Sequence, residues 1–283
     1  MKEMKASQRN QLGLDYKVIS FSGCYHGHSL LTLSTSSHPQ KFNLPTYDSI
    51  ILDFPHDRSD TKHALANLRA AFETNDGKVA AVIIQPITSF THHTADPEFF
   101  REARMMAKEF DVSFIVDETH SGGGSTGFMW HHETWGLHEP DLPDMMTFGK
   151  KTQISGIFTT DKYWKQGCEW GLFPGMGIDP VRLLQFETIT RAMAEERLLE
   201  KPVAIGEHLK RAMKSKGLHP RGLGTQLAFD LNSHQQTVNA IKKLRSAGII
   251  VNPAGPKSIG LDPALIFDSK HANEFSSALG HCF

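Results

Sequence analysis

Asp117 and the later lysines Lys150 and Lys151 are the residues whose types and settings most directly suggest chemistry. Asp117 follows the apolar run SFIV, and the two lysines follow TFG at the end of a second short run. An acid at the carboxyl end of a buried strand can face a ligand of an open α/β sheet. A lysine there can form a Schiff base with an aldehyde cofactor if its pKa is lowered. For each segment alone, a solvated acid and a surface lysine pair remain the simpler alternatives.

Two further segments could accommodate a planar ligand. The run Ser121–Gly124, SGGG, comes directly after the acid, and glycine lets the backbone approach a ligand closely. Tyr25 lies in CYHGH after the first apolar run and could stack on a ring. A plain flexible loop and a core aromatic explain the same residues equally simply.

Histidine is abundant, but its spacing does not indicate a metal site. The chain has 16 histidines, including the pairs His92-His93 and His131-His132. Neither pair has the i, i+4 helical spacing with a third ligand that is typical of zinc sites. We therefore expect no metal.

Short apolar runs alternate with amphipathic helices in the first part of the chain. The runs Val18–Phe21, Val79–Ile84 and Val112–Val116 are short and rich in β-branched residues, which predicts buried strands. Asp60 is expected to cap one helix, and Asp96-Pro97 to open another. Strands alternating with helices of this length predict an α/β fold with a mostly parallel sheet.

The pattern changes towards the C-terminus. Asp179-Pro180 is expected to start a long helix that runs to about Glu200, and Pro202 to begin another. The expected elements that follow are a strand at Leu227–Leu231, a helix through Val238, Ile241 and Leu244 that ends before Gly248, and short strands near Ile249 and Leu265. We therefore predict a large α/β domain over residues 1–198 and a small α+β domain over residues 203–283.

Composition excludes several classes of function. The 283 residues include 30 Lys+Arg and 31 Asp+Glu, so a net charge of −1 gives no electrostatic reason to bind nucleic acid or an anionic membrane. No apolar run approaches the ~20 residues that span a bilayer, and the first residues lack the apolar core of a signal peptide. Three cysteines without a close pair indicate a reducing compartment.

Taken in order, these segments resemble the class III (fold type I) pyridoxal-phosphate aminotransferases, and among them the 4-aminobutyrate aminotransferases. The stretches that carry the resemblance are SFSGCYHGHSLLTLSTSSH, VAAVIIQPITS, FFREARMMAKEFDVSFIVDETHSGGGSTGFMWHHETWGL, MMTFGKKTQISG, RGLGTQLAFD and GIIVNPAGPKSIGLDPALIF. The resemblance is most specific from Phe99 to Lys151, where the acid, the glycines and the lysine pair occur in the family's order and spacing. It implies a PLP-transferase fold of type I: a mainly parallel central sheet with helices on both faces, plus a small C-terminal α+β domain.

The resemblance also implies residue roles and pyridoxal 5'-phosphate as the cofactor. Asp117 matches the aspartate that keeps the pyridine nitrogen protonated, so that the ring acts as an electron sink. Lys151, the second lysine of the pair, matches the lysine that binds the cofactor covalently and moves a proton during catalysis. Tyr25 matches the aromatic residue that stacks on the ring. His120 replaces a glutamine that helps to hold the cofactor hydroxyl, and it can still form that hydrogen bond.

Three substrate-binding positions depart from the family pattern. His28 replaces the arginine that binds the carboxylate of 4-aminobutyrate, and an imidazole lacks the bidentate fork of a guanidinium. Gly260 replaces a second arginine, which binds the α-carboxylate of glutamate and 2-oxoglutarate. Gln85 replaces the glutamate that pairs with that arginine. The loss of both members of this arginine–glutamate pair is physically consistent, because a buried charge without its partner costs about 3–5 kcal/mol.

Phosphate binding departs from the pattern as well. The family's Ser/Gly-rich turn at a helix N-terminus is a natural anion site, and nothing in Met1–Asp15 resembles it. A threonine supplied across the dimer corresponds here to Gly175. We therefore expect weakened cofactor binding and a large domain that lacks its N-terminal part and exposes apolar surface.

Three functions follow as hypotheses. The first is pyridoxal-phosphate-dependent transfer of an amino group from an ω-amino acid, 4-aminobutyrate, to 2-oxoglutarate, impaired by these losses. The second is an inactive pseudo-aminotransferase that acts as a binding or dimerisation partner, and the third is a truncated relic. The resemblance implies amino and keto acids as small-molecule partners, a homodimer or a heterodimer with a full-length relative, and the mitochondrial matrix or the cytoplasm as the compartment, although no Arg-rich transit peptide is evident.

Overall fold

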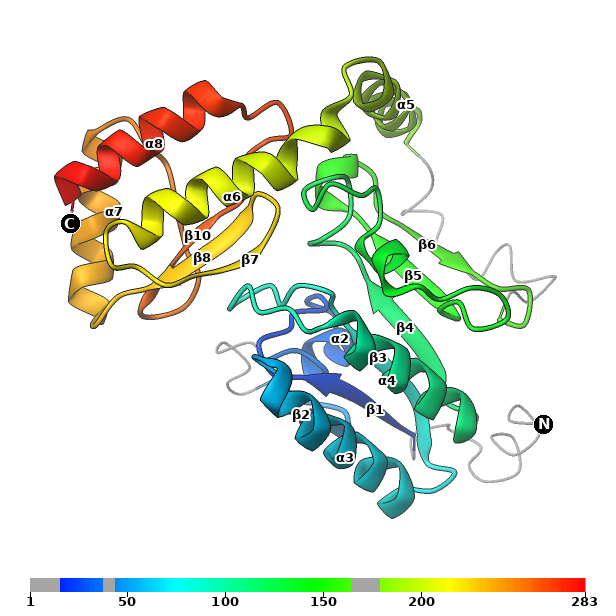
Figure 1. The fold of residues 1–283 in the computed structure, drawn as a ribbon. Helices are drawn as coiled ribbons and strands as arrows, with labels where there is room; N and C mark the ends of the chain where they lie inside the picture. The colour runs from blue at the N-terminus through cyan, green and yellow to red at the C-terminus, as the bar shows by residue number, and fades with distance from the viewer. Residues whose placement is uncertain (1–15, 38–43, 164–178, 283) are drawn as a thin grey trace.

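The computed structural model describes residues 16–37, 44–163 and 179–282, which form two sheets with their helices (Figure 1). The large sheet has the strand order β2-β1-β3-β4-β5-β6. Its strands are β1 (Lys17–Phe21), β2 (Ser49–Leu52), β3 (Val79–Ile84), β4 (Ser113–Asp117), β5 (Met145–Phe148) and β6 (Gly156–Thr159). Strands β1 to β5 pair in parallel, and only β6 runs antiparallel to its neighbour. The predicted α/β fold with a mainly parallel sheet is confirmed.

Two helices lie side by side along the large sheet, as Figure 1 shows: α3 (Arg58–Thr74) and α4 (Pro97–Glu109). Helix α4 begins at Asp96-Pro97, as expected. The predicted cap of α3 at Asp60 is wrong, because the Asp57 carboxylate accepts the backbone N–H groups of Ser59 and Asp60 and the helix begins one turn earlier. A short helix, α2 (Leu30–Ser34), precedes β2.

Aromatic residues fill the core between these helices and the large sheet. Phe21, Phe99 and Phe100 are fully buried there, and the rings of Phe100 and Trp135 stack at a centroid distance of 4.1 Å. Burying a large aromatic side chain contributes roughly 1.5–3 kcal/mol. This core holds the carboxyl ends of β3, β4 and β5 at one edge of the sheet, where the predicted site residues follow.

The second sheet is antiparallel, with the order β7-β8-β10-β9. Its strands are β7 (Pro220–Leu223), β8 (Gln226–Asp230), β9 (Asn252–Pro253) and β10 (Ser258–Leu261), and its helices are α6 (Lys201–Lys214), α7 (His234–Ser246) and α8 (Ser269–Cys282). The predicted strand near Leu227 and the helix ended by Gly248 are confirmed. The two short strands expected near Ile249 and Leu265 are present as β9 and β10, but each is displaced by a few residues. Ile249 still bonds to Leu244 at the end of α7, and Leu265 follows the end of β10.

The long helix expected to run to about Glu200 is interrupted. Helix α5 spans Pro180–Glu195, and Arg197 then adopts a left-handed φ of 51°, which an α-helix does not allow. A short 3-10 turn at Leu198–Glu200 leads into α6. The structure has two clusters of buried apolar residues, one spanning residues 19–146 and one spanning residues 205–279. The domain limits 1–198 and 203–283 stay a prediction.

Within the described parts of the chain, no helix combines the length and the apolar character needed to cross a membrane.

Candidate functional site

The carboxylate of Asp117 lies buried at the end of β4, and both of its oxygens accept hydrogen bonds. Its Oδ1 accepts the backbone N–H of Thr119 at 3.1 Å, the Thr119 hydroxyl at 2.6 Å and the Thr147 hydroxyl at 3.0 Å. Its Oδ2 accepts His26 Nδ1 at 2.8 Å and Gln85 Nε2 at 3.1 Å. Burial alone would raise the pKa of Asp117, but the bonds from His26 and Thr119 outweigh it and hold the pKa at about 2. Asp117 is therefore an anion at neutral pH.

His26 is a site residue that sequence reasoning missed. Its side chain is fully buried against Asp117, and its backbone N–H donates to Ser36 at 2.8 Å. Its Nε2 has no hydrogen-bond partner among the described residues. The only sequence signal was its place between Tyr25 and Gly27, in the segment expected to lie beside a ring.

Gln85 connects the Tyr25 segment to Asp117 through hydrogen bonds. Gln85 Oε1 accepts the backbone N–H groups of Tyr25 at 3.1 Å and Ser89 at 3.0 Å. Its Nε2 donates to the Tyr25 carbonyl at 2.8 Å as well as to Asp117. A neutral amide can do this because it carries both donors and acceptors, whereas a carboxylate only accepts.

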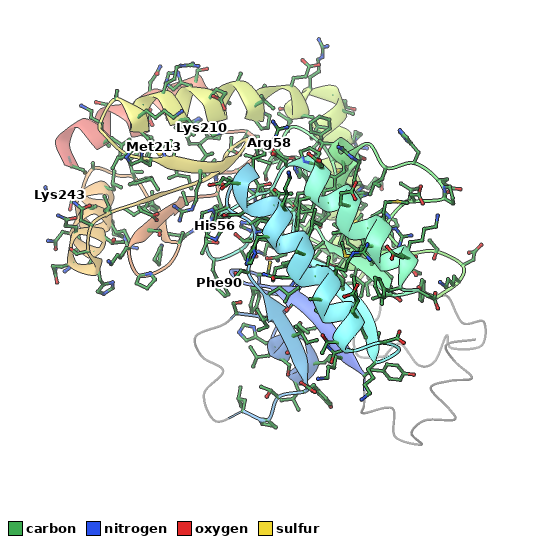
Figure 2. The ribbon with its side chains drawn as sticks, turned by 60° about the horizontal axis from the view of Figure 1, so that its bottom comes forward. His56, Arg58, Phe90, Lys210, Met213 and Lys243 are labelled. Atoms are coloured by element: carbon green, nitrogen blue, oxygen red, sulfur yellow. The ribbon has the colours of Figure 1, made fainter. Side chains whose placement is uncertain are left out.

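Tyr25 lies near this network, but His28 points to the surface. The Tyr25 hydroxyl is hydrogen-bonded to His28 Nδ1, and its ring meets Phe90 edge to face at a centroid distance of 5.7 Å. Phe90 belongs to the loop after β3, which Figure 2 shows beside the second sheet. His28 is exposed.

The two lysines follow β5 in a 3-10 turn at Lys150–Thr152, and they face different neighbours. Lys150 Nζ lies 3.3 Å from His120 Nδ1, and Lys151 Nζ donates to the Pro263 carbonyl at 2.8 Å. Burial lowers the pKa of both ammonium groups. The negative charges of Asp117 and Asp262 oppose that lowering for Lys150, and the charge of Asp262 opposes it for Lys151. Both ammonium groups therefore lie in the field of Asp262, and Lys150 is the more exposed of the two residues.

Gly123, in the glycine run after Asp117, allows that loop to pack closely against the lysine turn. Gly123 adopts a φ of 77°, and a Cβ built on it would lie 2.9 Å from Lys151 Cβ. A larger residue at this position would push the lysine turn away from the loop. The glycines after Asp117 thus permit close packing of the loop on the lysine turn.

His120 is buried between the lysine turn and two further polar residues, His92 and Asp262. Burial and, after it, the charge of Lys150 lower the pKa of His120 to about 3. Its Nε2 lies 3.8 Å from Asp262 Oδ1, and His92 Nε2 lies 3.3 Å from Asp262 Oδ2. Burial would raise the pKa of Asp262, but the His92 hydrogen bond and the charge of His120 hold it at about 2.

Gly260 lies in β10 beside His92, which is bonded to Asp262. A Cβ built on Gly260 would lie 3.2 Å from both His92 Cε1 and Ala254 Cβ. His92 thus fills the space in front of Gly260. The structure brings Asp117, Gln85 and Tyr25 into one hydrogen-bond network and sets Gly260 beside a separate one, while the predicted Gly175 lies outside the described residues.

The comparisons with known proteins agree on one family. The sequence model of that family, described as aminotransferase class-III, matches residues 1–283. The chain is 30% identical over 288 residues to the mitochondrial 4-aminobutyrate aminotransferase of Mus musculus, covering 93% of this chain and 57% of that protein. It is 32% identical over 279 residues to the 4-aminobutyrate aminotransferase of Dictyostelium discoideum, covering 91% and 56%. The chain thus spans a little over half the length of these curated relatives.

Solved structures give the same fold. The lysine aminotransferase of M. tuberculosis superposes with a TM-score of 0.85 at 25% identity, over 100% of this chain and 69% of that one. A transaminase from the marine bacterium Virgibacillus gives a TM-score of 0.83 at 21% identity, over 99% and 70% of the two chains. The predicted type I architecture is confirmed.

Proposed function

Because this chain belongs to the class-III aminotransferase family, we propose that it binds pyridoxal phosphate and transfers an amino group from an ω-amino acid, 4-aminobutyrate, to 2-oxoglutarate at a reduced rate. The observation that carries the proposal is the buried, ionised carboxylate of Asp117 on the same sheet edge as Lys151, a half-buried lysine whose pKa burial lowers. An anion and a reactive amine on one edge are what an aldehyde-bearing pyridine ring requires.

The residues present fit the cofactor in charge and in donor chemistry. The Asp117 anion suits a protonated pyridine nitrogen, and Gln85 can release Asp117 Oδ2 while it keeps its bonds to Tyr25 and Ser89. His120 would hold the ring hydroxyl, and Tyr25 would lie beside the ring. The cofactor, when bound, supplies an electron sink for the negative charge that develops at the substrate carbon.

We assign the covalent attachment to Lys151, the lysine that the family resemblance matches. The support is that burial lowers the pKa of Lys151, and that the glycine loop after Asp117 packs on this residue, since a Cβ on Gly123 would lie 2.9 Å from Lys151 Cβ. A buried lysine with a lowered pKa carries more of the neutral, nucleophilic amine at neutral pH. The same amine can afterwards hold a proton next to the substrate carbon.

Substrate binding is the weak part of the proposed site. His28 is exposed, and neither Gln85 nor Gly260 supplies a guanidinium to a substrate carboxylate. Each lost charged hydrogen bond is worth about 1.5–3 kcal/mol, so two lost clamps lower kcat/KM by roughly 10²–10⁴-fold. We expect turnover with a high KM.

We further propose a homodimer, or a heterodimer with a longer relative, in the mitochondrial matrix. The compartment is supported by the mouse relative, whose name places it in mitochondria. The dimer is supported by the exposed apolar side chains of α5 and β6, among them Leu184 and Ile157.

The test adds pyridoxal phosphate to the purified chain and follows the visible band of lysine-bound cofactor. We expect the band in wild type and in Lys150→Ala, and its loss in Lys151→Ala. Loss in Lys150→Ala alone would move the attachment to Lys150, and no band in wild type would reject cofactor binding. Glutamate formed from 4-aminobutyrate and 2-oxoglutarate then measures turnover.

One observation favours the pseudo-aminotransferase as a second candidate. Asp117 already accepts five hydrogen bonds, whereas a carboxylate offers about four lone-pair sites. If these donors keep the carboxylate occupied, the pyridine nitrogen gains no partner. This candidate predicts neither a visible band nor glutamate formation from a folded protein.

A further inference from the structure

We propose that His92, His120 and Asp262 form a binding site for one divalent transition-metal ion, with Zn²⁺ as the best match. Their ligand atoms, two imidazole nitrogens and one carboxylate oxygen, all lie within 4.8 Å of one another. Two histidines and one carboxylate are a common zinc ligand set. The residues come from three loops, after β3, β4 and β10, that meet where the second sheet contacts the large one.

The spacing of these atoms is close to that of a tetrahedral zinc site. With metal–ligand distances of about 2.0–2.1 Å, neighbouring ligand atoms are about 3.3 Å apart. His92 Nε2 lies 3.3 Å from Asp262 Oδ2, and His120 Nε2 lies 3.8 Å from Asp262 Oδ1. Binding of one ion by all three residues would therefore move the His120 ring closer to Asp262.

Unpartnered polar atoms point to a missing ligand. Both histidine side chains are more than nine-tenths buried. His120 Nε2 and Asp262 Oδ1 have no hydrogen-bond partner among the described residues. A buried polar atom without a partner costs about 1–3 kcal/mol, and a metal ion would satisfy both atoms at once.

The backbone holds His92 in an unusual conformation that aims it at this group. His92 has a φ of 56°, and its N–H donates to the Thr88 carbonyl at 2.9 Å. A left-handed conformation is uncommon for residues other than glycine and often accompanies function. The ring of His92 meets that of His120 at a centroid distance of 5.1 Å and 84°.

Two nearby lysines, Lys150 and Lys151, limit the affinity for a metal ion. Lys150 Nζ contacts His120 Nδ1, which leaves Nε2 to face Asp262, and Lys151 Nζ donates to the Pro263 carbonyl next to Asp262. Asp262 supplies the single negative charge of the ligand set. We therefore expect a micromolar dissociation constant, well above that of a closed structural zinc site.

Three protein ligands leave the fourth coordination position of Zn²⁺ open to an anion. Because Gly260 lies against His92, a substrate carboxylate reaching this space would have the metal in place of the absent guanidinium. That use rests on the proposed function, whereas metal binding itself does not.

The test is metal titration of the chain without cofactor. Its result therefore does not depend on whether the proposed function is correct. Zn²⁺ binding is measured by calorimetry after chelator treatment, and Co²⁺ is added as a spectroscopic probe. We expect one equivalent of Zn²⁺, an intense visible Co²⁺ spectrum of tetrahedral type, and a loss of affinity of at least ~100-fold in Asp262→Asn and His120→Gln.

His93→Gln is the matched control, because His93 adjoins His92 but its ring packs on His56 at 3.9 Å, outside the group. It should bind Zn²⁺ like wild type. Zn²⁺ should also raise the melting temperature of wild type and of the control, but not of the two ligand variants.

No binding to wild type at ~100 μM Zn²⁺ would overturn the site. Equal binding by Asp262→Asn would do the same, because it would assign the metal to other histidines. Should both ligand variants fail to fold, the wild-type Co²⁺ spectrum decides: a weak octahedral spectrum rejects the proposed site.

Discussion

At the scale of single residues, the charge of Asp117 depends on donors from four separate segments. His26, Gln85 and Thr119 follow three different strands and Thr147 lies in β5, yet all four donate to this one carboxylate. Hydrogen bonds to the ionised form lower a carboxyl pKa, and here they outweigh the effect of burial. The network thus keeps an anion at the sheet edge and ties the surrounding loops together.

This pKa predicts how stability depends on pH. The pKa of Asp117 falls from the usual 3.8 to about 2 on folding, so its contribution of about 2 kcal/mol is complete above pH ~4 and is lost as the pH falls through ~2. In Asp117→Asn, this part of the acid dependence of the unfolding free energy should disappear. Denaturant titrations between pH 2 and 6 measure it.

Asp48→Asn is the control, because Asp48 is an exposed partner of Lys17 and should leave the curve nearly parallel to that of wild type. Identical acid dependence in wild type and Asp117→Asn would contradict the assigned shift.

Gln85→Glu, which introduces the residue that the resemblance implies for this position, should destabilise this chain. The new carboxylate would face Asp117 Oδ2 and the Tyr25 carbonyl, to which Gln85 Nε2 now donates at 3.1 and 2.8 Å. Like charges and lost donors should cost about 3 kcal/mol at neutral pH, measured by urea unfolding. Gln235→Glu, on the exposed face of α7, should change stability by less than about 0.5 kcal/mol. A loss equally small at position 85 would refute the predicted network.

Local sequence patterns could identify only part of the candidate site. Asp117 and Tyr25 stand beside buried strands, so their neighbourhood was predictable from short runs of sequence. His92 and Asp262 are 170 positions apart and meet through folding alone, so no local spacing reveals them. The difference between Lys150 and Lys151 likewise depends on the 3-10 turn after β5.

At the scale of elements, glycines set how closely α6 approaches the large sheet. A Cβ on Gly206 of α6 would lie 2.0 Å from the Gly224 carbonyl oxygen, and one on Gly224 would lie 2.1 Å from the Ser125 oxygen. The Thr225 N–H also donates to Ser125 at 3.0 Å. Helix α6, the β7–β8 turn and the glycine loop after Asp117 therefore pack as three layers of backbone.

Two glycine-to-alanine changes in helices should have opposite effects. Gly206→Ala should lower the free energy of unfolding by about 3 kcal/mol or more, because the methyl group meets backbone that cannot move aside. Gly280→Ala in α8 should raise it by about 0.5–1 kcal/mol, because only the end of the Lys216 side chain is near and alanine favours helix. Thermal and urea unfolding of both variants measure the difference. A stabilised Gly206→Ala would show that α6 does not pack this closely.

The elements that sequence predicts well are those buried on both sides. Strands β3 and β4 are continuous apolar runs, and their positions are confirmed within one residue. Strand β6 was missed because most of its residues are exposed and do not alternate. The end of α5 was misplaced because the sequence stays helix-compatible through Arg197, whose left-handed backbone breaks the helix.

At the scale of the whole molecule, apolar side chains gather on α5 and β6. Val181, Leu184, Ile157 and Phe158 are each more than half exposed. Phe148 connects the two elements, because its ring stacks on Phe158 at 5.1 Å and on Phe186 of α5 at 6.2 Å. Such a face commonly marks a protein contact.

This face predicts self-association. Sedimentation velocity should show dimers of the wild-type chain, and Ile157→Glu together with Leu184→Glu should shift them to monomers by placing charge in the contact. Ile250→Glu is the control, because Ile250 is 81% exposed but lies in the loop between α7 and β9, away from α5 and β6. A monodisperse wild-type monomer with a cooperative melting transition would rule out a dimer through this face.

Three side chains donate to backbone carbonyls across the boundary between the two sheets. Arg221 Nε donates to the Thr91 carbonyl, Gln226 Nε2 to the His120 carbonyl and Lys151 Nζ to the Pro263 carbonyl. Denaturants solvate such peptide groups directly, so mild urea should favour a sub-global opening in which two intact lobes separate before either core unfolds. Amide hydrogens in the loops after β3 and β4 would then exchange with solvent sooner than those within the strands.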